Sequence, residues 1–344
     1  MKGTMKQVVL SASEQFQVRD VEIPALEQGQ ALIRVRAVGI CGSDIHTYYG
    51  KHPFVHAPIV LGHEACGEIV ELSDEQTDLR VGDRVVIRPQ RTCGACRNCR
   101  LGRYNECKYL NVLGCLSTGA SSEYFAVETQ ILYKIPDFLS YAEGTALEPL
   151  AVGVHAVKRA GSVEGKNVLV LGAGTIGNMT AQAALGLGAK KVMITDISAF
   201  KLGLARSCGI ELCVNVAEES LEEAIEREFP DESLDLIMEC TANEGVFAQA
   251  IDLAPKGIDI VIVGVFEDKP RVDMAGVQDR EYRLIGALMY TDEDYRDAIR
   301  LAGDREVHLD RVITDTFPLV ESASAYKHIE ANRHTTQKVI LSLD

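Results

Sequence analysis

The sequence lacks an apolar run of the roughly 18 residues that a membrane-spanning helix needs. Its first residues also lack the apolar core of a signal peptide. Basic residues are scarce, since 35 lysines and arginines stand against 50 aspartates and glutamates. The resulting formal charge of −15 repels nucleic-acid phosphates, and no basic cluster offers a surface for anionic membranes. We therefore expect a cytoplasmic protein with neither a nucleic-acid nor a membrane partner.

Tryptophan is absent, and aromatic residues make up 6% of the chain, so the composition gives no clue to a subunit interface. Low-complexity segments and repeats of solenoid period are also absent. The 47% hydrophobic and 25% charged content is typical of a globular protein. A chain of 344 residues exceeds one ordinary hydrophobic core and predicts two domains.

Cysteine, in contrast, is concentrated in one loop. Cys93, Cys96, Cys99 and Cys107 follow the spacing C-x2-C-x2-C-x7-C. In a reducing compartment such clusters bind metal more often than they form disulfides. The long last gap, followed by Lys108 instead of proline, departs from the ferredoxin pattern. We predict a closed tetrahedral zinc site with a structural role, and we keep a redox loop of free or paired cysteines as the alternative.

A second metal site is predicted from residues scattered along the chain. Cys41, His63 and Glu148 supply one sulfur, one nitrogen and one carboxylate. Three protein ligands, with a fourth position left for water or substrate, are typical of catalytic zinc. Each residue alone also has a structural explanation. Cys41 could be a small buried apolar residue, and His63 could be a hydrogen-bonded histidine at the end of a strand. Glu148 could be an acidic residue that interacts with a helix N-terminus.

A glycine-rich turn predicts a dinucleotide site. The apolar run Asn167–Leu171 has the pattern of a buried parallel strand and leads into G-x-G-x-x-G, followed by a helical stretch. Gly172 permits the tight turn, Gly174 lets backbone amides approach a pyrophosphate, and Gly177 lets the helix pack closely. The helix N-terminus then favours the anion.

The next strand, Lys191–Thr195, ends at Asp196, about twenty residues past the glycines. An acid there accepts hydrogen bonds from ribose hydroxyls and repels a 2′-phosphate, which favours NAD over NADP. The alternative is that Asp196 only caps the next helix, near Ala199. Further strand-like runs follow at Leu234–Cys240, Ile258–Phe266 and Arg283–Met289. Their alternation with helical patterns predicts an α/β doubly wound parallel sheet.

Several motifs together resemble the zinc-dependent medium-chain alcohol dehydrogenase superfamily over essentially the whole chain. They are GICGSDIH, VLGHEACGEIV, VGDRVVI, the cysteine loop, ALEPLAVGVHA and LGAGTIG. The sequence is most similar to the polyol branch, sorbitol (L-iditol) dehydrogenase, and to bacterial sugar-acid oxidoreductases of the L-galactonate type. The resemblance implies a mainly-β GroES-like catalytic domain over 1–150, completed by 289–344, and a Rossmann NAD-binding domain over 151–288. It also implies a homotetramer or homodimer.

The resemblance implies roles for residues of this chain. The catalytic-zinc residues are Cys41, His63, Glu64 and Glu148, where the two glutamates bind directly or through water, and the structural-zinc ligands are Cys93, Cys96, Cys99 and Cys107. The catalytic proton relay comprises Ser43 and His46, beside Glu64. The cofactor residues are Gly172, Gly174, Thr175, Ile176, Gly177, Asp196, Lys201, Cys240, Val263 and Val265. The substrate residues are Tyr48, Lys51 and Tyr290.

The implied reaction is the reversible oxidation of a secondary alcohol of a polyol to a ketose, with NAD and two zinc ions per subunit. Met289-Tyr290 stands where the polyol branch often has Arg-Tyr, so the particular polyol stays open. Lys51, His52 and His56 form a basic set that favours a sugar acid as the alternative substrate, although a solvated loop is the preferred explanation for His52 and His56. A threonine or butanediol dehydrogenase and a non-enzymatic nucleotide-binding protein also stay open. A zinc-free quinone reductase is disfavoured, because that branch lacks the cysteine loop.

Overall fold

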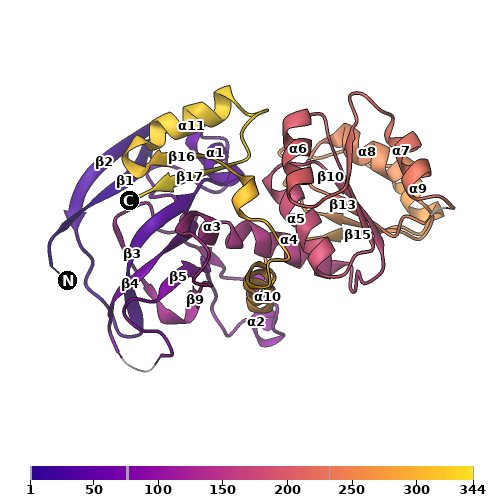
Figure 1. Ribbon diagram of the computed structural model, residues 1–344. Coiled ribbons are helices and arrows are strands. Elements are labelled where there is room, and N and C mark those ends of the chain that lie inside the picture. Colours follow the sequence, from indigo (N-terminus) through magenta and orange to yellow (C-terminus); the bar gives the residue numbers. More distant parts are fainter. Residues whose placement is uncertain (1, 75–76, 232, 344) are drawn as a thin grey trace. The chain divides into compact units, whose positions relative to one another are not determined.

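The computed structural model describes residues 2–74, 77–231 and 233–343. The chain forms two compact units, of which the first comprises Met1–Glu148 and Ile313–Asp344 and the second Pro149–Val312 (Figure 1). The sequence-based boundaries placed residues 289–312 with the first domain, whereas the structure groups them with the second unit. The other proposed boundary, between residues 150 and 151, lies two residues from the observed one between Glu148 and Pro149.

The first unit is built on an open sheet with the order β16-β17-β3-β4-β5-β9, in which β8 also pairs with β3. These strands are β3 (Gln30–Gly39), β4 (Glu64–Leu72), β5 (Arg84–Ile87), β8 (Tyr124–Glu128), β9 (Leu132–Lys134), β16 (Ile313–Pro318) and β17 (Lys338–Ser342). The C-terminal strand β17 lies antiparallel beside β3 and pairs Ile340 with Gly39 (Figure 1). The tail of the chain therefore completes the sheet of the N-terminal unit.

Buried apolar side chains on three neighbouring strands form the core of this unit. Ile33, Val35 and Val38 of β3 are buried with Ile69 of β4 and Leu341 of β17 in one hydrophobic core. The remaining elements of the unit are the hairpin β1 (Thr4–Ala12) and β2 (Gln15–Glu22), the short pair β6 (Gln90–Arg91) and β7 (Asn111–Val112), and the helices α1 (Gly42–Tyr48), α2 (Arg97–Arg100), α3 (Tyr141–Thr145) and α11 (Ser322–Ala331).

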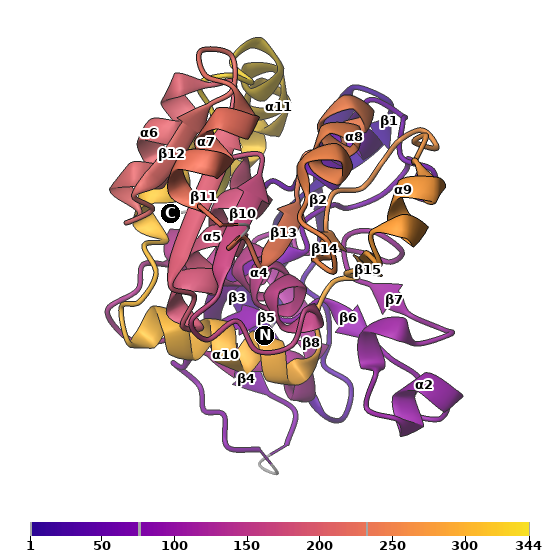
Figure 2. The same cartoon turned by 90° about the vertical axis from the view of Figure 1, so that its right-hand side faces the viewer.

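The second unit contains a parallel sheet with the strand order β12-β11-β10-β13-β14-β15 (Figure 2). Its strands are β10 (Asn167–Leu171), β11 (Lys191–Asp196), β12 (Leu212–Asn215), β13 (Leu236–Glu239), β14 (Asp259–Ile262) and β15 (Arg283–Gly286). The sequence-based runs match these strands except β12, whose short segment LCVN has no distinct apolar pattern. All strands are parallel, but the order in which the chain adds them reverses between β10 and β13, the place where doubly wound sheets bind ligands.

Helices cover both faces of this sheet. They are α4 (Leu147–Arg159), α5 (Thr175–Gly186), α6 (Ala199–Ser207), α7 (Leu221–Glu228), α8 (Glu244–Leu253), α9 (Met274–Asp279) and α10 (Asp292–Gly303). Leu169 and Leu171 of β10 pack in one core with Ala224 of α7 and Phe247 of α8. The intervening Val168 and Val170 are also fully buried, and successive strand side chains point to opposite faces. Burial on both faces explains why β10 is continuously apolar.

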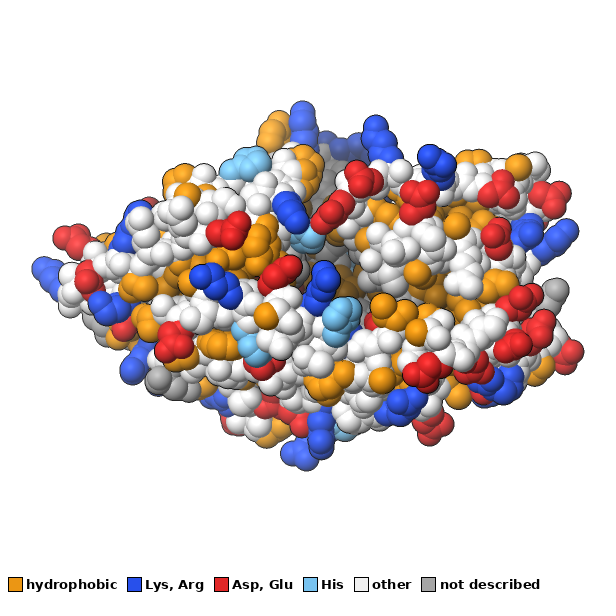
Figure 3. All heavy atoms as spheres, turned by 90° about the horizontal axis from the view of Figure 1, so that it is seen from above, with side chains coloured by type: hydrophobic (Ala, Val, Ile, Leu, Met, Phe, Trp, Pro, Cys, Tyr) orange, Lys and Arg blue, Asp and Glu red, His pale blue; other side chains and the backbone are white. Residues whose placement is uncertain are grey.

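Charged side chains of both signs are mixed with apolar and neutral ones on the face seen in Figure 3. The acidic excess of the composition is therefore spread over this face and does not form a separate patch there. Among the described residues, none of the helices has the length and apolar character to cross a bilayer.

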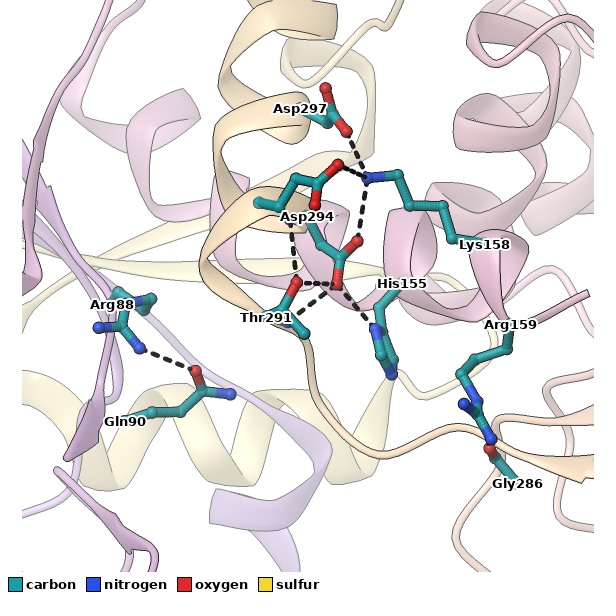
Figure 4. Close-up of polar contacts among 10 residues, drawn as sticks. Arg88, Gln90, His155, Lys158, Arg159, Gly286, Thr291, Asp294 and Asp297 are labelled. Atoms are coloured by element: carbon teal, nitrogen blue, oxygen red, sulfur yellow. Dashed lines mark hydrogen bonds and ion pairs between the residues drawn. The ribbon is translucent and has the colours of Figure 1, made fainter. Parts of the chain in front are cut away.

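A polar cluster ties α10 to α4 and explains why residues 289–312 belong to the second unit (Figure 4). Asp294 accepts hydrogen bonds from the Thr291 amide at 2.9 Å and hydroxyl at 2.7 Å, which caps α10. The same carboxylate oxygen also lies 2.7 Å from Nδ1 of the buried His155 of α4. Lys158 of α4 lies 3.2 Å from Asp294 and 2.5 Å from Asp297. Removing Asp294 would leave His155 and Lys158 without this carboxylate.

Candidate metal centres and cofactor site

The four cysteines of the loop form a compact sulfur cluster. The Sγ–Sγ distances are 4.0 Å for Cys93–Cys99, 3.5 Å for Cys96–Cys99, 4.0 Å for Cys96–Cys107 and 3.6 Å for Cys93–Cys107. A tetrahedral ion with zinc–sulfur bonds of about 2.3 Å requires separations of about 3.8 Å. Each of the chain's ten cysteines lies in the described ranges and is a free thiol. The geometry therefore fits a closed four-thiolate zinc site and contains no disulfide in the described residues.

Backbone amides donate hydrogen bonds to sulfur atoms of this cluster. The Cys96 amide donates to Cys93 Sγ at 3.3 Å, and the Cys93 amide donates to Cys107 Sγ at 3.4 Å. Hydrogen bonds from the amides of Cys99 and Lys108 lower the pKa of the Cys96 thiol to about 6. Such donors stabilise the thiolate, which is the form that binds metal.

A second set of ligand-type atoms belongs to Cys41, His63 and Glu64, and these atoms lie within 4.8 Å of one another. The register of the sheet explains their proximity, since Gly39 at the end of β3 pairs with Glu64 at the start of β4. Cys41 follows as the N-cap of α1. Glu148, at the start of α4, is buried but stands outside this set among the described residues. One sulfur, one nitrogen and one carboxylate can hold a zinc ion with an open position.

Asp44 joins two of these residues, although its sequence position alone predicted no role for it. One carboxylate oxygen accepts a hydrogen bond from the Cys41 amide at 3.0 Å, and the other lies 3.4 Å from His63 Nδ1. Burial alone would lower the pKa of His63, but the charges of Asp44, Cys115 and Cys41 raise it well above its ordinary value. The surroundings of His63 therefore favour positive charge, as a cation site requires. The sequence feature that could have indicated this role is an acidic residue at the third position of a short helix, directly after a cysteine at the N-cap.

Lys338 is the second residue that sequence reasoning missed. Its Nζ lies 2.7 and 2.5 Å from the two carboxylate oxygens of Glu64, and it donates to the Ile40 carbonyl at 3.1 Å. The side chains of Lys338 and Glu64 are 2% and 1% exposed, so this ion pair is buried. Burial would lower the pKa of Lys338, whereas Glu64 and Cys41 raise it above its ordinary value. A lysine opening the apolar strand KVILS was the available signal.

Ser43 and His46 both lie on α1, three residues apart and therefore on one side of the helix. Each is half-buried. The helix that Cys41 caps therefore carries both polar groups of the predicted proton relay. The chain reverses after this helix, because the amides of Lys51 and His52 donate to the His46 carbonyl at 2.8 and 3.2 Å.

The predicted substrate residues have different positions. Tyr48 has no exposed surface, its ring packs against Phe16 and Tyr326, and its hydroxyl donates to the Glu14 carbonyl at 3.3 Å. Tyr48 therefore lies in the hydrophobic core, and its role as a substrate residue stays a prediction. Tyr290 also has no exposed surface, with its ring centroid 5.4 Å from that of Tyr295. Lys51 is exposed, with Nζ 5.9 Å from the centroid of the Tyr49 ring.

The glycine turn of the second unit has the geometry of a phosphate-binding loop. Gly172 follows β10 with a φ of +93°, a conformation that favours glycine. A Cβ on Gly177 would lie only 1.8 Å from the Gly172 carbonyl oxygen, so any side chain there would collide. Gly174 caps α5, whose first residues Thr175 and Ile176 are half-buried. The amides of this helix start can therefore receive a pyrophosphate.

Asp196 lies at the same edge of the sheet, since Leu171 pairs with Thr195. Its carboxylate accepts hydrogen bonds from the Ala173 amide at 2.8 Å and the Ser198 amide at 2.8 Å. The cap of α6 is Ser198, which accepts from the Lys201 amide. The alternative that Asp196 only caps α6 therefore does not hold. The half-buried carboxylate is placed beside the glycine turn with lone pairs left for ribose hydroxyls.

The remaining cofactor candidates follow neighbouring strands. Cys240 comes directly after β13 and Val263 directly after β14, and the register pairs Glu239 with Ile262. The buried Glu239 accepts hydrogen bonds from the amides of Thr241 at 2.7 Å and Ala242 at 2.9 Å, which orders the turn after β13. Lys201 lies in the first turn of α6, and Val265 is 87% exposed in the loop after β14. Parallel strand ends thus gather these residues at one sheet edge.

Comparison with known proteins identifies the class. Two family models match: the alcohol dehydrogenase GroES-like domain over residues 27–137 and the zinc-binding dehydrogenase over residues 175–304. The chain is 32% identical to sorbitol dehydrogenase 1 of Saccharomyces cerevisiae over 97% of each protein. It is 30% identical to L-galactonate-5-dehydrogenase of Escherichia coli over 99% of each. Galactitol-1-phosphate dehydrogenase from Escherichia coli, a solved structure, aligns with a TM-score of 0.90 at 30% identity, over 98% of this chain and 100% of that chain.

The chain therefore belongs to the zinc-dependent medium-chain alcohol dehydrogenase superfamily. Within that class it is a zinc-binding dehydrogenase of the polyol and sugar-acid branch, which confirms the resemblance inferred from the motifs. The GroES-like and doubly wound fold is confirmed as well. The two candidate zinc sites and the glycine turn fit the cofactors of this family, zinc and a nicotinamide dinucleotide.

Proposed function

We propose that this protein catalyses the reversible, NAD-dependent oxidation of a secondary alcohol of a polyol to a ketose. The observation that carries the proposal is the set of Cys41, His63 and Glu64, which offers one thiol, one imidazole and one carboxylate within 4.8 Å. Support for the substrate class comes from relatives named sorbitol dehydrogenase, putative D-xylulose reductase and L-galactonate-5-dehydrogenase.

The chemistry divides between cofactors and protein. When bound at Cys41 and His63, zinc supplies Lewis-acid polarisation of the substrate hydroxyl, and the dinucleotide supplies the hydride acceptor. Ser43 accepts the hydroxyl proton, and His46 passes it to solvent from the same side of α1. Asp44 holds Cys41 and His63 in their relative positions. Lys338 compensates the charge of Glu64 beside them, and Glu148 lies close enough to raise the pKa of Lys338.

The proposal is tested by initial rates of NAD reduction with alditols, inositols, aldonates, threonine, 2,3-butanediol and simple alcohols. A rate on one alditol that disappears after chelation of zinc would establish a polyol dehydrogenase and define its stereochemistry. A rate confined to threonine or butanediol would replace the polyol assignment. Bound zinc and NAD without turnover of any of these compounds would contradict it.

A sugar acid is the second candidate substrate, and the exposed Lys51 favours it. Its ammonium group is on the segment that follows α1, where a substrate carboxylate could be paired with it. His52 and His56 are on the same segment. Aldonate turnover in the panel above, without alditol turnover, would support this candidate over the polyol.

We also predict the cofactor preference from Asp196. An Asp196→Asn variant keeps the size of the side chain but removes the charge that disfavours a 2′-phosphate. We expect the ratio of kcat/KM for NADP to that for NAD to rise about 10- to 100-fold, the range of a charge-assisted hydrogen bond. Steady-state rates with both dinucleotides measure it.

Ser198→Ala is the matched control for this variant. It removes the cap of α6 two residues away and leaves the Asp196 carboxylate in place. Stability should fall by about 0.5–2 kcal/mol, while the NADP/NAD ratio stays at the parent value. An equal shift of the ratio in both variants would mean that Asp196 acts only through local structure.

Cytoplasmic location and a homodimer or homotetramer are parts of the same proposal. The free thiols in the described residues support a reducing compartment. Light scattering coupled to size exclusion would give the subunit number, and fractionation of the source cells would give the location.

A further inference from the structure

The segment that follows α1 contains a histidine whose tautomer is set by the backbone. His52 Nδ1 accepts hydrogen bonds from the amides of Phe54 at 3.2 Å and Val55 at 3.1 Å. Because these amides can only donate, Nδ1 carries no proton and the neutral ring carries its hydrogen on Nε2. The backbone therefore fixes His52 as a hydrogen-bond donor with a defined direction.

This donor has no acceptor within the described ranges. The interactions of His52 are the two amide bonds at Nδ1, its own amide bond to the His46 carbonyl, and an edge contact with the Phe54 ring at 6.3 Å. The side chain is half-buried. A fixed, half-buried N–H is suited to an acceptor that arrives from outside the protein.

The position of His52 relates it to the candidate metal set. Its amide donates at 3.2 Å to the carbonyl of His46, the proposed relay residue. Burial first, and then the charges of His46 and His56, lower the pKa of His52, while Asp44 acts in the opposite direction. Asp44 in turn lies 3.4 Å from His63. The backbone of His52 is therefore tied to the proposed relay residue, and the lowered pKa of its ring favours the neutral form.

We propose that His52 Nε2 donates a hydrogen bond to a substrate oxygen remote from the reacting carbinol carbon. This inference rests on the proposed function, because only a polyhydroxylated or carboxylated substrate offers such an oxygen. The acceptor is a hydroxyl of an alditol or the carboxylate of an aldonate. His52 then contributes to the preference of the enzyme for these compounds over simple secondary alcohols.

The test compares His52→Asn with His334→Asn. Asparagine can place Oδ1 where Nδ1 accepts the two amide bonds, as in an Asx turn, but it has no donor at the reach of Nε2. His334 is exposed, lies outside this segment and serves as the matched control. Steady-state kinetics are measured with an alditol, an aldonate and butan-2-ol, and thermal unfolding checks that both variants are folded.

We expect His52→Asn to raise KM about 3- to 10-fold for the alditol or about 10- to 100-fold for the aldonate, the ranges for neutral and charged acceptors. Its kcat should stay within about twofold, and its kinetics with butan-2-ol should not change, because no remote oxygen is lost. His334→Asn should behave like the parent with all three substrates. A larger rise in KM for the alditol identifies the acceptor as a hydroxyl, and a larger rise for the aldonate identifies it as a carboxylate.

Three results would overturn the inference. An unchanged KM for alditol and aldonate means that Nε2 contacts no substrate. An equal rise for butan-2-ol means that the variant disturbs the segment and not a remote contact. If the parent enzyme oxidises butan-2-ol but no alditol or aldonate, the proposed function itself fails, and this result is distinct because it precedes any substitution.

Discussion

A Cys41→Ala variant should bind one zinc ion per chain where the parent binds two, and its turnover should fall at least about 10³-fold. The loss follows from the donor set. Without Cys41, only an imidazole and a carboxylate remain of the atoms that lie within 4.8 Å of one another. The four cysteines of the loop are untouched, so their ion stays bound. Metal analysis of the purified protein and initial rates with the preferred substrate measure the two effects.

Cys115→Ala is the matched control for this experiment. Cys115 is also a free thiol, and its Sγ lies 3.7 Å from His63 Nδ1, but it stands outside the three-residue set. We expect this variant to keep both zinc ions and a rate within a few-fold of the parent. If Cys41→Ala kept its metal and its turnover, the proposed catalytic site would be wrong. If both variants lost one ion, Cys115 would have to be counted among the ligands.

A Lys338→Met variant should lower the free energy of unfolding by about 3–5 kcal/mol, the usual cost of leaving one partner of a buried ion pair without its counter-charge. The Glu64 carboxylate is 1% exposed, and both of its oxygens contact Lys338 Nζ. Methionine has a similar length but cannot donate to Glu64 or to the Ile40 carbonyl. Urea unfolding at a fixed zinc concentration measures the loss.

Two further variants define what the loss means. The double variant Lys338→Met with Glu64→Gln removes both charges and should recover much of the stability, since no unpaired ion remains. Lys6→Met removes one partner of the exposed ion pair with Asp20, whose Nζ–Oδ1 distance is 2.8 Å, and should leave stability near that of the parent. If Lys338→Met cost no more than Lys6→Met, the buried pair would not have the role assigned to it.

Much of the protein could be predicted because the signals are local. The strand Asn167–Leu171 and its glycine turn follow directly from an apolar run and from residues without side chains. The four cysteines lie within one loop, so their spacing already restricts how far apart the sulfur atoms can be. The second unit was predictable for the same reason, because each strand is followed by its own helical pattern.

The features that the sequence did not reveal depend on contacts between distant segments. The hydrophobic pattern could not show that Tyr48 is enclosed by Phe16 and Tyr326, since nothing local distinguishes a core tyrosine from a substrate-facing one. The assignment of residues 289–312 differs because Asp294 meets His155 and Lys158, more than a hundred positions earlier.

The sequence by itself determined which atoms are available: the thiols, the imidazole, the carboxylates and the glycine turn. Only the tertiary structure decided which of them meet. Antiparallel pairing of β17 with β3 brings Lys338 to Glu64, 274 positions earlier in the chain. The same pairing determines that the negative charge of Glu64, beside Cys41, is the one that the Lys338 ammonium group balances. Asp44 could be read as a helix-cap residue, yet its second oxygen faces His63. Such pairs form because burial penalises an unpaired charge, and this penalty exists only once the surrounding elements have packed.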